Sequence, residues 1–130
     1  MFTDDNYCFA CGKNNPQGLK MDITRADGWA EACVVLNREH QGWRKIAHGG
    51  MVATLLDEIM AHAVIHKVPQ SVTAELKVRF KQAAPVETPL LVRGEIVKQT
   101  SRVIVARAEL RLEETGQLLA QAESKFLVVK

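Results

Sequence analysis

The run from Met51 to His66 constrains the fold of this chain more than any other segment. Eleven of its sixteen residues are Ala, Val, Ile, Leu or Met and none is proline, which predicts a helix of about four turns that is apolar on most sides. Such a helix has to be enclosed by other elements. Asp57, Glu58 and His62 interrupt the run, whereas a membrane span needs about 20 mostly apolar residues. We therefore expect a buried helix and no membrane partner.

The segments on either side of this helix have the patterns of β-strands. Leu19–Ile23 alternates apolar and polar residues, and a turn at residues 26–28 separates it from the β-prone run Trp29–Leu36, which predicts a hairpin. After the helix, short breaks between strands favour antiparallel neighbours. The four strands predicted there cover residues 73–81, 89–98, 102–112 and 118–129. In the first of them, Ala74, Leu76, Val78 and Phe80 share one face.

These elements predict an α+β domain in which a single antiparallel sheet wraps one long central helix. The domain is expected to span residues 18–130, because 130 residues with 47% hydrophobic content suit a single core. Residues 1–17 are expected to form an N-terminal arm, because Cys11–Gly18 is rich in Gly, Asn and Pro.

Charge and cysteine content exclude several classes of function. A net charge of +2 with scattered basic residues gives no field that would attract nucleic acid. The first 20 residues carry the acidic pair Asp4-Asp5 and no apolar signal core, and three cysteines cannot all pair. We expect a cytoplasmic protein with reduced thiols, in which Cys33 is a small core residue.

Asp57 is the first candidate catalytic residue. Its helical neighbours at three and four positions are small or apolar, so burial is expected to raise the pKa of its carboxyl group and its basicity. The alternative is a structural ion pair with a strand cation such as Arg79. Glu58 lies about 100° further round the helix, on a polar stripe that we expect to face a subunit interface or solvent. The stripe consists of Thr54, Glu58, His62 and His66.

His48-Gly49-Gly50 precedes the apolar run and is the second candidate. The first N–H groups of a helix lack an internal partner, and glycines there let a carbonyl oxygen approach closely, which suits an oxyanion hole. The alternative is a pair of glycines that only relieves a tight turn.

The spacing of His48-Gly49-Gly50 and Asp57, together with residues 72–80, resembles hotdog-fold thioesterases of the phenylacetate-degradation type. The resemblance covers about residues 18–130 and implies a hotdog fold, a homodimer or homotetramer, no cofactor, and hydrolysis of acyl-coenzyme A thioesters. It implies that Asp57 activates water or attacks directly, that the Gly49 N–H polarises the thioester carbonyl, and that Thr73 orients water. The candidate catalytic residues are thus Asp57, Gly49, His48 and Thr73.

Substrate contacts are expected at both ends of the thioester. Many relatives place Asn or Gln six residues before the motif histidine, where this chain has Gly42, so Gln41 or His40 would substitute through a one-residue shift of the loop. Gly50 is a further candidate substrate contact. The thioester carrier is expected to be coenzyme A or a carrier protein. The phosphates of coenzyme A are expected to bind Arg79, Lys81 and Arg102. These three residues also fit a solvated strand face. Two other functions remain open: a non-catalytic acyl-thioester-binding module, and a hydratase or dehydratase that would use His48.

No metal is expected. Cys8 and Cys11 could share zinc, but such a site needs four ligands and the sequence has no second cysteine pair. His62 and His66 lack the order of the usual zinc-binding helix motif.

Overall fold

The computed structural model describes residues 2–129 and contains one long helix and six strands. The helix is α1 (Gly49–Ile65), and it follows β1 (Thr24–Ala26), β2 (Trp29–Val35) and the short 3₁₀-helix η1 (Arg38–His40). The chain continues through β3 (Ser71–Phe80), β4 (Pro89–Gln99), β5 (Val103–Leu112) and β6 (Leu118–Val128). The predicted helix and the four predicted strands after it are confirmed within two residues at each end.

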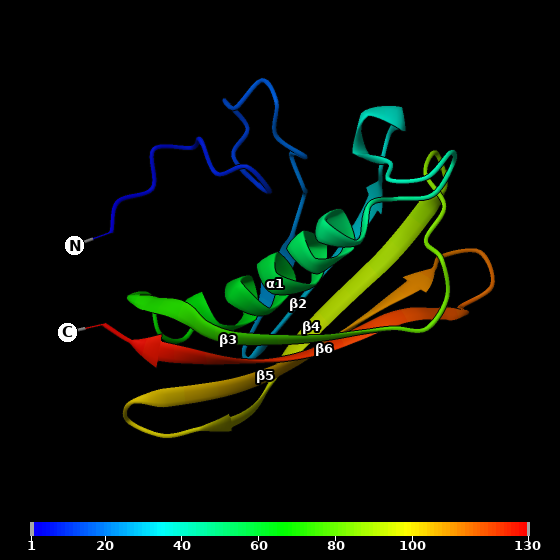
Figure 1. Cartoon of the computed structure of the whole chain (residues 1–130). Coiled ribbons are helices and arrows are strands. Elements are labelled where there is room, and N and C mark those ends of the chain that lie inside the picture. Colours follow the sequence, from blue (N-terminus) through cyan, green and yellow to red (C-terminus); the bar gives the residue numbers. More distant parts are fainter. Residues whose placement is uncertain (1, 130) are drawn as a thin grey trace.

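All six strands form one antiparallel sheet in the order β1-β2-β4-β5-β6-β3, and the sheet curves around α1 (Figure 1). This confirms the predicted hotdog arrangement. The expectation that each short break joins neighbouring strands is wrong for β3 and β4. Strand β3 lies at the edge of the sheet beside β6, whereas β4 lies between β2 and β5. The segment between β3 and β4 pairs instead with the loop before α1, through Ala47 N–H to Ala84 O (2.8 Å) and Val86 N–H to Lys45 O (3.1 Å). It therefore crosses the N-terminal end of the helix.

The apolar side chains of α1 form part of the hydrophobic core. Seven of its residues are buried, and none between Met51 and Ile65 is fully exposed. Helix and sheet approach each other closely at Gly94 in β4, where an added Cβ would lie 3.1 Å from the Ile59 side chain. Within residues 2–129, no helix is long and apolar enough to cross a membrane.

The predicted first hairpin is shorter than expected. Leu19–Ile23 is not a strand, because the N-terminal arm competes for its backbone: Leu19 N–H donates to Phe9 O (2.8 Å) and Met21 N–H to Ala10 O (2.9 Å). The prediction that Cys33 is a core residue is also wrong. Its side chain is exposed on β2 and donates to Glu113, while its neighbours Ala32 and Val34 point inward.

Strand β3 lies at an edge of the sheet and is poorly covered. A bulge interrupts its pairing with β6 between Thr73 and Glu75. Of the apolar face predicted for this strand, Leu76 is 37% and Phe80 56% exposed, and Val78 is half-buried. A ten-residue edge strand with exposed apolar side chains is a surface that proteins usually cover by further pairing.

Candidate functional site

The N-terminus of α1 is capped by the candidate histidine. His48 is the N-cap residue, and its Nδ1 accepts a hydrogen bond from the Gly50 N–H (2.8 Å). The structure therefore assigns the Gly50 N–H to the cap and not to a substrate. The N–H of Gly49 makes no backbone or side-chain hydrogen bond within residues 2–129, as expected for the first turn of a helix. It is the donor that remains for an oxygen ligand.

Asp57 lies two turns further along the same helix and meets β3. Thr73 Oγ1 donates a hydrogen bond to Asp57 Oδ1 (2.8 Å). Burial raises the pKa of Asp57 and the charge of Glu58 adds to this, while the Thr73 hydrogen bond opposes it; the net pKa lies above its ordinary value. None of the described cations forms an ion pair with Asp57, so the structural ion pair with Arg79 is not found.

Gly49 and Asp57 are too far apart to act on one carbonyl group within a single chain. Eight residues separate them, and eight residues rise about 12 Å along a helix. A base attacking the carbonyl carbon and a donor bound to its oxygen must both lie within a few ångströms of the same bond. One chain thus provides two half-sites, each next to a different end of β3.

The half-site at Gly49 lies beside a shallow depression of about 270 Å³. Phe80 and Lys81 line it from the end of β3, and a Cβ added to Gly49 would meet Phe80 at an ordinary contact distance of 3.6 Å. Gln41 is held in the preceding loop, where its Oε1 accepts from the Lys45 N–H (3.0 Å). Trp43, which was not predicted as a site residue, is 81% exposed in this loop.

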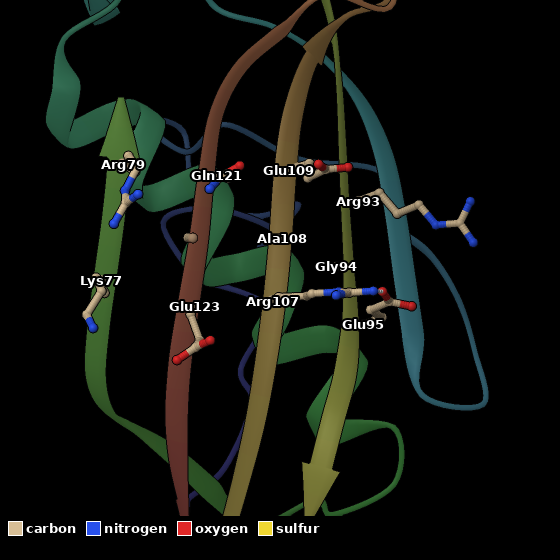
Figure 2. A pocket seen from close by; sticks show the side chains of 11 residues that line it. Lys77, Arg79, Arg93, Gly94, Glu95, Arg107, Ala108, Glu109, Gln121 and Glu123 are labelled. Carbon is tan, nitrogen blue, oxygen red and sulfur yellow. Dashed lines mark hydrogen bonds and ion pairs between the residues drawn. The ribbon is translucent and has the colours of Figure 1, made fainter. Parts of the chain in front are cut away.

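The three basic residues predicted to bind phosphates are not brought together. Lys81 lines the depression, whereas Arg79 lines an open hollow of about 870 Å³ on the opposite face of the sheet, with α1 behind it (Figure 2). Arg102 precedes β5, where its carbonyl accepts from the Val128 N–H (3.0 Å). Val128 pairs with Ser71, at the other end of β3, about 30 Å from Phe80 in an extended strand.

The large hollow on the outer face of the sheet is lined mainly by charged side chains. Lys77, Glu123, Arg107 and Glu95 lie on four successive strands with alternating sign (Figure 2), and the Arg107 guanidinium pairs with Glu95 at 2.6 Å. Opposite charges on neighbouring strands stabilise a solvated sheet face. Arg79 therefore belongs to a charged outer surface and not to either half-site.

The N-terminal arm covers Glu58 and His62, the middle of the polar stripe of α1, while His66 is exposed. The expectation that the stripe faces solvent or a subunit interface is therefore wrong for Glu58 and His62. Cys8 Sγ lies 3.6 Å from Glu58 Oε2, and His62 Nε2 lies 3.0 Å from the same oxygen and 3.4 Å from Cys11 Sγ. Burial would raise the pKa of Glu58, but hydrogen bonds from His62 and from the thiols outweigh it, and the net pKa is below its ordinary value. In the sequence the cysteines and the histidines form two separate pairs far apart in the chain, so this cluster was not predicted. The Glu58-x-x-x-His62 spacing on one helix face was the signal available.

A comparison with protein families finds the thioesterase superfamily, whose profile matches residues 45–119. Mouse acyl-coenzyme A thioesterase 13 is 25% identical over 88 residues, which cover 66% of this chain and 63% of the mouse protein. The matched region is thus less than two thirds of that relative's length.

Solved structures agree with the fold. The E. coli PaaI protein from the phenylacetic acid degradation operon superposes with a TM-score of 0.80 at 18% identity, covering 86% of this chain and 81% of that one. A hypothetical thioesterase from Streptococcus pneumoniae, solved with coenzyme A, has a TM-score of 0.79 at 24% identity, covering 84% of this chain and 85% of that one.

Proposed function

The chain belongs to the thioesterase superfamily, and from this we propose that it hydrolyses acyl-coenzyme A thioesters with a site that two copies of the chain build together. The observation that carries the proposal is Asp57. Its carboxylate is half-buried, has a raised pKa, is oriented by Thr73 and has no cationic partner among the described residues. These are the properties of a general base.

The proposed reaction is a water attack on the thioester carbonyl. Asp57 removes a proton from the water as its oxygen bonds to the carbonyl carbon, and Thr73 fixes the carboxylate during this step. The Gly49 N–H stabilises the oxyanion of the tetrahedral intermediate. When the intermediate collapses, the C–S bond breaks and the proton held by Asp57 passes to the departing thiolate. The products are a carboxylic acid and free coenzyme A.

Pairing of the β3 edges of two chains would assemble this site. Phe80 lies against Gly49, and Thr73 is bonded to Asp57, so each half-site is attached to one end of β3. A two-fold axis through the middle of an antiparallel β3–β3 pair places the Thr73 end of one chain beside the Phe80 end of the other. The Asp57 half-site of each copy then faces the Gly49 half-site of its partner, and Leu76 and Phe80 are covered.

The nucleotide of coenzyme A is proposed to bind near the depression at Gly49. Lys81 lines the depression, and the loop before α1 carries exposed Arg44 and Lys45 beside exposed Trp43. Cations bind phosphate oxygens, and an indole ring offers a stacking surface for adenine. The coenzyme A bound in the Streptococcus pneumoniae relative supports this class of substrate.

Replacement of Asp57 by Asn tests the proposal, because Asn is nearly isosteric and removes only charge and basicity. Turnover of an acyl-coenzyme A panel, followed by release of free thiol, should fall by roughly 10²–10⁴-fold while thioester binding is retained. The free energy of unfolding at neutral pH should be equal or higher in Asp57→Asn. Folding raises the pKa of Asp57, so the folded protein is destabilised as the pH rises through that pKa and the carboxyl group ionises, whereas Asn does not ionise.

Asp22→Asn is the matched control, since its carboxylate is 98% exposed and should keep parental turnover. Thiol release by Asp57→Asn at the parental rate would refute the assigned role. Binding without turnover by the parental protein would favour the acyl-binding module, and hydration of an enoyl thioester without thiol release would favour the hydratase.

A further inference from the structure

Four groups of metal-ligating type meet where the N-terminal arm crosses α1. The sulfur atoms of Cys8 and Cys11 and a carboxylate oxygen of Glu58 lie within 4.8 Å of one another. The Nε2 of His62 adds a fourth ligand atom, 3.4 Å from Cys11 Sγ and 3.0 Å from Glu58 Oε2. Ligand atoms bound tetrahedrally to zinc at about 2.0–2.3 Å lie roughly 3.3–3.8 Å apart. The Cys8–Glu58, Cys11–His62 and Glu58–His62 separations of 3.0–3.6 Å are therefore close to those of a zinc site, while Cys8 and His62 lie further apart.

Local structure holds both pairs of ligands in place. Glu58 and His62 are one helical turn apart on the same face of α1, and their side chains are only 16% and 20% exposed. The thiols are brought together by a tight turn, in which the Gly12 N–H donates to Cys8 O (2.8 Å). A Cβ at Gly12 would lie 2.3 Å from the Cys8 nitrogen. Only glycine allows the turn to close in this way.

We propose that Cys8, Cys11, Glu58 and His62 bind a structural Zn²⁺ ion that fastens the N-terminal arm to α1. The expectation of no metal rested on the lack of two further ligands, and the tertiary structure supplies them. Four protein ligands fill a tetrahedral shell, so no position is left for a catalytic water, as is typical of structural zinc sites. Asp57 is not a ligand, and the inference does not depend on the proposed hydrolysis.

Binding requires two local changes. The thiols must lose their protons to solvent, because thiolates are the ligands. Arg25 Nη1 lies 3.2 Å from His62 Nδ1, and a guanidinium can only donate, so without metal the proton of His62 is on Nε2. When Nε2 binds Zn²⁺ this proton moves to Nδ1, and the exposed Arg25 side chain has to swing away.

The test is metal binding by the full-length chain, stripped with a chelator and kept reduced with a phosphine. Titration with Zn²⁺ should saturate at one ion per chain and raise the melting temperature. Co²⁺ should give the intense visible bands of a tetrahedral site with thiolate charge transfer. An octahedral Co²⁺ spectrum, or no binding at micromolar Zn²⁺, would overturn the proposal without any variant being needed.

Variants then identify the ligands. The double variant Cys8→Ser, Cys11→Ser should lose the ion, and His62→Gln should bind Zn²⁺ at least about tenfold more weakly. Cys33→Ser is the control, because this thiol lies on β2 beside Glu113, and it should keep full occupancy. Zinc retained by the double variant would also contradict the proposal. Since the readout is metal content, failure of the zinc site and failure of the hydrolase activity are distinguishable.

Discussion

At the scale of single residues, Asp57 shows how local environment sets chemistry. Two carboxylates are adjacent in the chain, yet the pKa of Asp57 is raised and that of Glu58 is lowered. Both are desolvated, and the difference lies in their hydrogen-bond donors: Glu58 receives them from His62 and two thiols, whereas Asp57 has the single hydroxyl of Thr73. Burial therefore dominates at Asp57.

The pH dependence of turnover should report this environment. A base works only when ionised, so the rate should fall as the pH drops through the raised pKa of Asp57. Thr73→Val removes the one hydrogen bond that lowers this pKa, so the acid limb of kcat should shift to higher pH. Kinetics across a buffer series measure the shift.

Thr88→Val serves as the control, because the Thr88 hydroxyl bonds to the Val86 carbonyl (3.1 Å) away from Asp57. Its acid limb should coincide with that of the parental protein. An unshifted limb in Thr73→Val would mean that Thr73 does not control the ionisation of Asp57.

At the scale of elements, β3 differs from the other long strands. It is bonded to β6 on one side, and the other side is the edge of the sheet. The alternation of its sequence predicts one apolar face, but in the single chain that face is largely exposed. This exposed apolar face supports the proposed pairing of two chains through β3.

A charge in the middle of β3 should separate the two copies. Leu76→Glu would place two like charges beside the two-fold axis and bury them, which strongly destabilises a strand pair. We expect a folded monomer without hydrolytic activity, detected by light scattering and circular dichroism. Val97→Glu makes the same kind of change at an exposed position of β4 and should leave a dimer. An active monomeric Leu76→Glu protein would exclude the shared site.

At the scale of the whole molecule, the shared site predicts complementation between two inactive chains. In Gly49→Ala the added Cβ fits beside Phe80 at 3.6 Å, so folding should be retained while approach to the N–H is hindered, at a cost of about 10²-fold in turnover. A mixed dimer of Gly49→Ala with Asp57→Asn contains one site with both functional residues intact. Random exchange should restore roughly one quarter of parental activity.

The experiment requires only that the two variants be unfolded together, refolded and assayed. Each variant treated alone is the control and should stay inactive. If the mixture is no more active than its components, Gly49 and Asp57 do not act together across two chains.

Local sequence patterns were sufficient to predict one long central helix and the four strands that follow it. The apolar content of residues 51–66 required enclosure. Strict alternation in residues 73–81 and three β-prone runs separated by turn residues predicted the four strands after the helix, because residue preference and periodicity are local properties of the chain. Asp57 and Gly49 were identifiable for the same reason, since desolvation on a helix and free N–H groups at its start are local properties. The resemblance alone implied that Thr73 orients water, and its hydrogen bond to Asp57 was not predicted.

Tertiary structure decided everything that depends on which distant segments meet. Strand order placed β3 at an edge, away from β4, and separated Arg79, Lys81 and Arg102, which sequence alone had grouped by charge. The N-terminal arm forms backbone hydrogen bonds with Leu19 and Met21, and it places Cys8 and Cys11 beside Glu58 and His62. Sequence patterns encode which face of an element is apolar, but not which element covers it, because contacts between distant residues depend on the closure of the whole sheet.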